Sequence, residues 1–146
     1  CITKAYRVLE LLGMKKIEHI GIAVKDLEAS NRLFSKIFGK EIYKSELVDS
    51  EGVKTSFFKI GGSKIELVSS IQSDSPISRY LEKNREGMHH IAFDVEDIHE
   101  EIERIEKEGI RVINKTPKKG ADNKLICFLN PKDTNGVLIE LCQDLG

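Results

Sequence analysis

The sequence predicts an α+β fold in which two βαβββ modules pair to form an incomplete barrel around a cleft. Two observations carry this prediction. The segment HIGIAVKDLEAS, which begins at His19, is answered 71 residues later by HIAFDVEDIHEE, which begins at His90. Each segment reads as a strand followed by a helix, and three further strand patterns follow each one. A duplication of this length indicates two similar modules within one fold.

The first module, about residues 14–72, opens with a strand over 17–24 that is rich in β-branched residues. Asp26 is suited to cap the following helix, LEASNRLFSKIF, and Gly39 is suited to end it. We expect this helix to place five apolar side chains on one face: Leu27, Leu33, Phe34, Ile37 and Phe38. Three strands are expected next, the last two divided by a Gly-Gly turn: about 40–48, 53–60 and 63–70.

Both modules are expected to belong to a single domain that spans residues 14–146. The preceding residues 1–13 do not match the alternation that follows, and Met14 stands directly before KKIEHIGIAV. We therefore expect 1–13 to be an N-terminal extension. Between the modules, DSPISRYLEKN has helical spacing of its apolar residues and offers Asp74 or Ser75 as a cap, so a connecting helix is expected there.

The second module, about residues 86–146, begins with a strand at about 88–95. Asp97 then caps a helix through IHEEIERIEKE, which Gly109 closes. Its inward-facing residues are expected to be Ile98, Ile102 and Ile105. Three strands complete the second βαβββ pattern: about 110–115, 124–129 and 136–143.

Composition argues for a soluble globular protein and against two classes of partner. Of 146 residues, 40% are hydrophobic, which is enough to bury a core. The 23 basic and 24 acidic residues are interspersed, so nucleic acid and membrane surfaces are not expected partners. Neither a membrane-spanning run nor a signal-peptide pattern is present, and a cytoplasmic location is expected. Cys1, Cys127 and Cys142 have no CxxC spacing, so we expect reduced, structural cysteines.

The candidate functional residues are polar side chains inside apolar strands. Each half supplies one His and one Glu: His19 in IEHIGIAV with Glu66 in KIELVSS, and His90 in MHHIAFDV with Glu140 in LIELCQD. Because side chains alternate along a strand, His19 shares a face with the small residues Gly21 and Ala23. A single His of this kind is more often a core residue than a ligand, but a buried strand Glu is costly unless it is paired or bound to a cation. The repeated combination predicts a metal site.

Two imidazoles and two carboxylates form a nitrogen and oxygen donor set. Such a set favours Co²⁺, Mn²⁺, Ni²⁺, Fe²⁺ or Zn²⁺ over calcium or a thiolate-bound metal. Four protein ligands on an octahedral ion leave two adjacent positions for water or for a substrate that chelates through two oxygens. The predicted cleft is therefore a metal cleft in which catalysis is expected.

The segments HIGIAV with its DLEAS helix, KIELV, GMHHIAFDV and NPKDTNGVLIEL together resemble the methylmalonyl-CoA epimerase family of the vicinal oxygen chelate, or glyoxalase, superfamily. The resemblance spans about 14–144. It implies a glyoxalase-like fold, a homodimer in many members, and epimerisation of (R)- and (S)-methylmalonyl-CoA by α-proton abstraction and a metal-stabilised enolate. It also implies a divalent metal bound by four residues: His19, Glu66, His90 and Glu140.

Alignment of HIAFDV with HIGIAV makes His90 the expected ligand, so His89 should point to the other face in a packing or hydrogen-bonding role. Epimerisation needs an acid/base on each face of the enolate, and Glu140 is expected to be one of them. Some family members carry a second Glu where this chain has Thr55, which is no base near neutral pH. The second base is therefore open, with Glu51 a nearby carboxylate in the sequence.

Two alternative functions are kept: lactoylglutathione lyase or another oxygen-chelate enzyme, and a metal-free binding module. Lactoylglutathione lyase, or glyoxalase I, also carries Glu at the position of Glu66, but that family resembles HTMLRV at its first strand, with an Arg where this chain has Ala23. A metal-free small-molecule binding module of the same fold would be expected to have lost ligands, and all four are present here.

Overall fold

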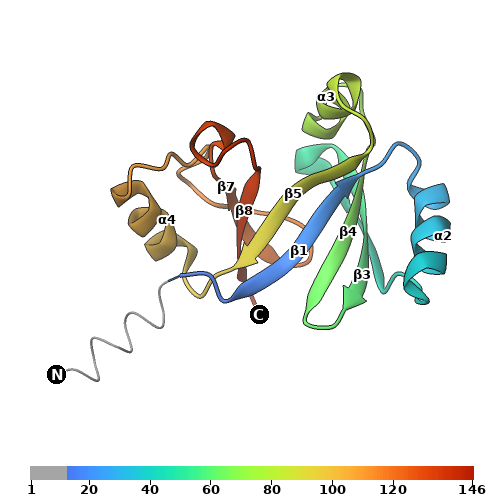
Figure 1. Ribbon diagram of the computed structural model, residues 1–146, viewed down its shortest axis with the longest axis horizontal. Helices are drawn as coiled ribbons and strands as arrows, with labels where there is room; N and C mark the ends of the chain where they lie inside the picture. Colours follow the sequence, from blue (N-terminus) through green and yellow to red (C-terminus); the bar gives the residue numbers. More distant parts are fainter. Residues whose placement is uncertain (1–12) are drawn as a thin grey trace. The chain divides into compact units, whose positions relative to one another are not determined.

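The structure is a computed structural model that describes residues 13–146. The predicted extension, residues 1–13, lies outside the described residues except for Gly13. In the described chain, a strand, a helix and three strands follow one another twice, and one helix connects the two sets (Figure 1). The two predicted βαβββ patterns are therefore confirmed.

Residues 19–90 form one compact unit. Its strands have the order β2-β3-β4-β1, with the bounds β1 Lys16–Ala23, β2 Lys44–Val48, β3 Val53–Ile60 and β4 Ser63–Ser70. β1 runs parallel to β4, whereas β3 pairs antiparallel with both β2 and β4. Two helices pack on this sheet, α2 against β3 and β4 and α3 against β4 (Figure 1); they span Leu27–Phe38 and Pro76–Lys83.

Helix α2 begins and ends as its capping residues predict. The Asp26 carboxylate accepts a hydrogen bond from the Ala29 N–H at 3.0 Å, and Gly39 ends the helix with φ 68°. The core face is narrower than expected, and consists of Leu27, Phe34 and Phe38 packed on β3 and β4. Leu33 and Ile37 are 54% and 62% exposed. Each immediately precedes a partly buried Phe in the sequence, so its side chain is rotated around the helix axis away from the core face. Their assignment to the core face was wrong.

Residues 13–18 and 91–146 belong to the second unit. The strand order β5-β8-β7-β6 repeats that of the first unit, with β5 Gly87–Asp94, β6 Lys118–Lys119, β7 Lys124–Phe128 and β8 Ile139–Asp144. β5 runs parallel to β8, and β7 pairs antiparallel with both β8 and β6. The same topology therefore occurs twice, down to the single parallel pair in each set.

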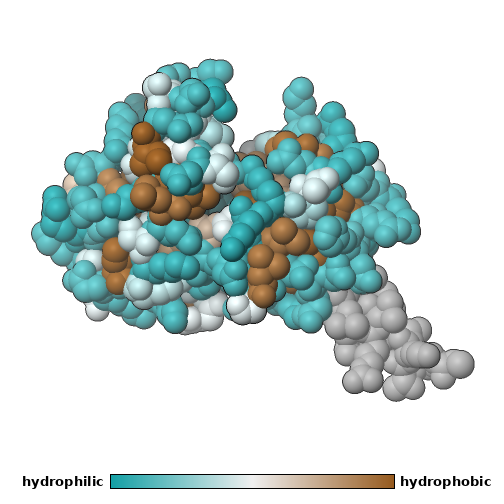
Figure 2. Space-filling view, turned by 180° about the vertical axis from the view of Figure 1, so that it is seen from behind, coloured by the Kyte–Doolittle hydropathy of each residue, from teal (hydrophilic) through white to brown (hydrophobic). Residues whose placement is uncertain are grey.

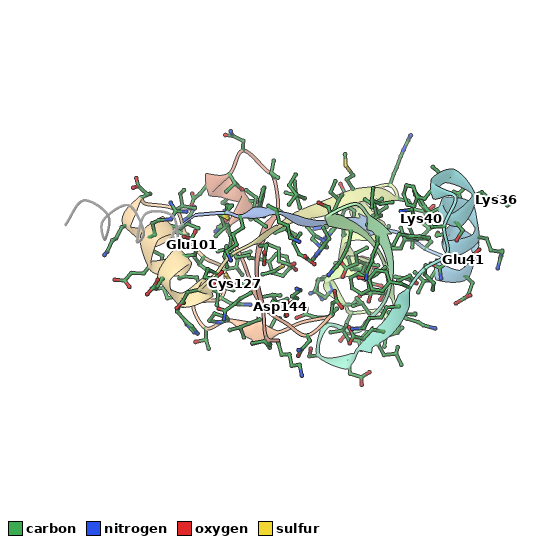
Figure 3. All side chains as sticks on the ribbon, turned by 90° about the horizontal axis from the view of Figure 1, so that it is seen from below. Lys36, Lys40, Glu41, Glu101, Cys127 and Asp144 are labelled. Carbon is green, nitrogen blue, oxygen red and sulfur yellow. The ribbon has the colours of Figure 1, made fainter. Side chains whose placement is uncertain are left out.

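Helix α4, Ile98–Lys107, is capped by Asp97 and buries the three predicted residues Ile98, Ile102 and Ile105. It also buries Glu101, which lies on α4 (Figure 3). The Glu101 carboxylate accepts hydrogen bonds from Arg104 Nε at 3.1 Å and Nη2 at 2.8 Å, and from the Gly13 N–H. This buried charge is therefore paired, which is the condition for tolerating it inside a fold.

The strand predicted at 110–115 does not form. Val112 makes only an isolated bridge with Leu129, and the first of the three strands after α4 is instead the short strand Lys118–Lys119. Pro117 stands directly before it and has no N–H for a longer ladder. Two other strands are shorter than predicted: Lys44–Val48 and Ile139–Asp144. Two 3₁₀ helices were not predicted: Asp49–Glu51 and Pro131–Asp133.

The face seen in Figure 2 is largely hydrophilic, with hydrophobic side chains in separate patches. Within residues 13–146 no helix combines the length and apolarity that a membrane span requires. Cys127 and Cys142 are buried and form no disulfide, and Cys142 lies within β8 as predicted. Cys1 lies outside the described residues.

Candidate metal centre

Two of the predicted ligands, His19 and Glu66, are brought together by the parallel pair of β1 and β4. Glu66 lies opposite Gly21 in the register of the two strands, two residues beyond His19. This register places His19 Nε2 3.8 Å from Glu66 Oε1. Both residues are buried, with 5% and 6% of their surface exposed. A nitrogen donor and an oxygen donor therefore face each other inside the unit formed by residues 19–90.

His90, the last residue of the same unit, completes the group. Its Nε2 lies 3.1 Å from His19 Nε2 and 3.3 Å from Glu66 Oε1. The two imidazole rings meet edge to face, with an interplanar angle of 88°. Three atoms of the types that bind metals thus converge on one small region: two ring nitrogens and one carboxylate oxygen. The structure brings these three predicted ligands together.

The absence of a side chain at Gly21 creates the space for His90. A Cβ built on Gly21 would lie 2.0 Å from His90 Cε1 and 2.4 Å from both ring nitrogens. The imidazole therefore occupies the volume that any larger residue at position 21 would fill. The sequence showed that Gly21 shares a face with His19, but not that a ring from β5 would lie against it.

The charges around Glu66 favour its ionised form. Burial alone would raise the pKa of this carboxyl, but the charge of His19 and a hydrogen bond from His90 outweigh burial and lower it. Glu66 is therefore a carboxylate with lone pairs to offer. Two imidazoles and a carboxylate suit first-row divalent metals, so this donor set fits the metal that the sequence predicts.

His89 makes the packing and hydrogen-bonding contacts that were predicted for it, and one of them is to His90. Its Nδ1 lies 2.9 Å from His90 Nδ1, and its ring meets Tyr80 of α3 edge to face, with centroids 4.7 Å apart. Burial, together with the nearby charge of His90, lowers the pKa of His89 to about 4. His89 is therefore a neutral imidazole at neutral pH. The contact between His89 and His90 is possible because Nδ1 of each ring is bonded to Cγ and therefore lies close to the backbone, so that the Nδ1 atoms of two adjacent strand residues can approach each other.

Glu140 lies on β8 of the second unit and is also buried. In the register of β5 and β8 it stands opposite Ala92, two residues beyond His90. Glu66 has the same relation to His19, so the duplication extends to the register of each His and Glu. The Cys142 thiol donates a hydrogen bond to Glu140 Oε2 at 2.9 Å. Burial and, to a lesser degree, the Glu140 charge raise the pKa of Cys127 to about 12, so that thiol stays protonated.

Two residues considered for the second acid/base role have different surroundings. Thr55 lies buried in β3, and its hydroxyl donates a hydrogen bond to the Glu46 carbonyl at 3.4 Å. This contact gives Thr55 a structural role at the pairing of β2 and β3. Glu51 lies at the end of the 3₁₀ helix Asp49–Glu51, and Gly52 separates it from the start of β3.

Comparison with known proteins identifies the family. Residues 18–128 match the family model of the Glyoxalase/Bleomycin resistance protein/Dioxygenase superfamily. The mitochondrial methylmalonyl-CoA epimerase of Dictyostelium discoideum is 37% identical over 140 residues, which cover 95% of this chain and 84% of that protein. The ethylmalonyl-CoA/methylmalonyl-CoA epimerase of Cereibacter sphaeroides is 40% identical over 130 residues, covering 88% and 97%.

A solved structure of methylmalonyl-CoA epimerase in complex with methylmalonyl-CoA and NH₄⁺ is similar to this one, with a TM-score of 0.88. The two sequences are 35% identical, and the match covers 92% of this chain and 97% of that chain. Together with the family match, this likeness confirms the predicted glyoxalase-like fold and the predicted resemblance.

Proposed function

Because the chain belongs to the methylmalonyl-CoA epimerases of the Glyoxalase/Bleomycin resistance protein/Dioxygenase superfamily, we propose that it interconverts (R)- and (S)-methylmalonyl-CoA at a divalent metal centre. One observation carries the proposal. The ring nitrogens of His19 and His90 and a carboxylate oxygen of Glu66 converge, all within 3.8 Å of one another. An acyl-CoA ester is the substrate class, and the reaction class is isomerisation.

Four residues are proposed as metal ligands: His19, Glu66, His90 and Glu140. The convergence of donor atoms supports the first three. Glu140 is supported by the duplication, because it stands opposite the residue two beyond His90, as Glu66 does with respect to His19. Both carboxylates are buried in strands, where an unpaired charge would be costly. The donor set suits Co²⁺, Mn²⁺, Ni²⁺, Fe²⁺ or Zn²⁺.

The chemistry begins at an acidic carbon. The α-hydrogen of methylmalonyl-CoA lies between a thioester and a carboxylate, and its removal places negative charge on the thioester oxygen. A divalent cation bound by these ligands would supply positive charge beside that oxygen. Glu140 is the proposed proton acceptor on one face of the substrate, and return of a proton from the opposite face inverts the carbon. Thr55 cannot supply that second group, which leaves Glu51 as the carboxylate to test.

The surroundings of Ala23 argue against lactoylglutathione lyase. Ala23 is fully buried in an apolar cluster with Val53, Val68 and Ile77. In the lyase family the first strand resembles HTMLRV, with an Arg at this position that would bind the glutathione carboxylate. The four buried side chains of this cluster are apolar, so none of them could bind this carboxylate instead. The epimerase therefore fits this chain better than the lyase.

The test compares two activities of the purified, metal-loaded protein. Epimerisation of methylmalonyl-CoA should be readily measurable by a coupled mutase assay, and turnover of the methylglyoxal–glutathione hemithioacetal should be negligible. The reverse ratio would replace the epimerase with the lyase. A homodimer and a cytoplasmic location stay predictions from the sequence, and light scattering tests the first of them.

A further inference from the structure

His89 contacts one ring nitrogen of His90, and the other ring nitrogen lies close to His19 and Glu66. His90 Nε2 lies near His19 and Glu66, whereas His90 Nδ1 lies 2.9 Å from His89 Nδ1. We propose that His89 is a positioning residue that fixes the tautomer and the orientation of His90 for metal binding. This inference rests on the proposed metal centre, and it assigns a role to a residue outside the four ligands.

The tautomer argument follows from the two nitrogens of a neutral imidazole. If Nε2 of His90 binds a metal, it must present a lone pair, so the ring proton lies on Nδ1. That N–H needs an acceptor, and His89 Nδ1 is at hydrogen-bonding distance. A ligating His commonly donates its other N–H to such a partner, which fixes the ring and its tautomer. Here the partner is the adjacent residue of the same strand.

His89 is in turn held by the connecting helix. The Tyr80 ring of α3 meets the His89 ring at an interplanar angle of 85°, and the Tyr80 hydroxyl donates a hydrogen bond to the Met88 carbonyl at 3.2 Å. Helix α3 begins at a Ser75 cap that is itself buried. Tyr80 therefore contacts β5 on both the side chain of His89 and the backbone of its neighbour.

Gly21 of β1 also lies against the His90 ring. The His90 imidazole fills the space above Gly21, where no Cβ intervenes. With the backbone of β1 against the ring and His89 at Nδ1, the direction of Nε2 is determined by two independent contacts. Loss of the His89 contact should leave the ring in place but remove the acceptor that selects its tautomer.

Two substitutions separate the acceptor from the packing. His89→Phe keeps a ring against Tyr80 but removes the acceptor nitrogen. His89→Asn shortens the side chain but keeps an oxygen near the position of Nδ1. Tyr80→Phe keeps the ring contact and removes only the hydroxyl, so it serves as a control. Thermal unfolding of each metal-free variant reports folding separately from metal binding.

The measurement is the affinity for Co²⁺, obtained by competition with a chromophoric chelator, together with the visible absorption spectrum of the Co²⁺ protein. His89→Phe should bind Co²⁺ about 10- to 100-fold more weakly than wild type and show a changed spectrum. His89→Asn should recover most of the affinity, and Tyr80→Phe should stay close to wild type.

Three results would overturn the inference, and they differ in what else they overturn. Wild-type affinity and spectrum in His89→Phe would remove the positioning role and leave the metal centre intact. Equal weakening in His89→Asn and His89→Phe would mean that an acceptor at this position does not restore metal binding, and would remove the acceptor role given to His89. Failure of the wild-type protein to bind Co²⁺, Zn²⁺ or Mn²⁺ would overturn the proposed metal centre itself, and this inference with it.

Discussion

Gly21 and His90 are matched in shape: the imidazole of His90 fills the volume that a side chain at residue 21 would occupy. A Cβ at that position would approach His90 Cε1 to 2.0 Å, far inside van der Waals contact. The ring therefore lies against the backbone of β1, where its Nε2 meets the Nε2 of His19 at 3.1 Å. A single missing methyl group thus permits the convergence of the two imidazoles.

Gly21→Ala is expected to disrupt this arrangement. Because neither the strand nor the ring can accept a Cβ there without moving, the variant should lose about 1–3 kcal/mol of unfolding free energy and bind metal at least about tenfold more weakly. Gly62→Ala is the matched control, since a Cβ at Gly62 meets nothing within 4 Å. Chemical denaturation and chelator competition measure the two quantities, and equal behaviour of both variants would contradict the role given to Gly21.

His90→Ala should abolish stoichiometric metal binding. Wild type should retain about one divalent metal per chain after purification, as expected for one site with a complete ligand set. His99→Ala is the control, because His99 is exposed on α4. Metal analysis by mass spectrometry checks both variants. Full occupancy in His90→Ala would remove His90 from the ligand set.

Glu140→Gln should separate proton transfer from metal binding. An amide oxygen can still bind a metal but cannot accept a proton near neutral pH, so kcat should fall by at least about 100-fold while most of the metal remains. Glu66→Gln should be tolerated if Glu66 is only a ligand. Thr55→Ala should change activity little, because the Thr55 hydroxyl contacts a backbone carbonyl.

The alternative outcomes of that series are also informative. If Glu140→Gln has near-wild-type activity and Glu51→Gln is inactive, then Glu51, rather than Glu140, is the residue that accepts the proton. Loss of activity in Glu66→Gln with full metal occupancy would make Glu66 the proton-transfer group.

Glu101→Gln should destabilise the second unit in a pH-dependent manner. Burial raises the pKa of Glu101, but the hydrogen bonds from Arg104 and Gly13 and the charge of Arg104 outweigh burial and lower it. Near pH 7 the substitution should cost about 1–3 kcal/mol, because the carboxylate acceptor is lost. Glu103→Gln, in an exposed pair with Lys107, should cost about 0–1 kcal/mol.

The sign of the pH dependence follows from the lowered pKa. The carboxylate contributes its stability fully above the unfolded pKa of 4.5, and this contribution is lost as the pH falls through the lower folded value. The difference in unfolding free energy between wild type and Glu101→Gln should therefore shrink as the pH is lowered from about 5. A difference that grows on acidification would contradict the assignment.

The strands and helices predictable from sequence are those with a strong period and clear boundaries. Val53–Ile60 and Ser63–Ser70 match the prediction because two glycines separate two alternating segments. The strand at 110–115 was wrong because alternation alone says nothing of whether a partner strand is available, and only Val112 forms a bridge. Leu33 was misassigned because helical spacing does not fix the width of the buried stripe.

The duplication identified the candidate ligands because it repeats polar residues at matched positions. Side-chain contacts between different strands and helices could not be predicted from the repeated pattern. The closeness of Gly21 and His90, and the contact of His89 with both His90 and Tyr80, depend on how residues from β1, β5 and α3 approach one another in space. A glycine two residues after His19 was the available signal, but glycine in a strand has several meanings.

Solvent-deuterium incorporation at the α-carbon of methylmalonyl-CoA tests the central claim most directly. The metal-loaded protein should place deuterium from D₂O on that carbon as it epimerises the substrate, because proton removal and return are the reaction. His90→Ala should lose both exchange and epimerisation, whereas His99→Ala should keep both. Absence of exchange by the metal-loaded wild type, or exchange at the wild-type rate by His90→Ala, would contradict the proposed metal-centred epimerase.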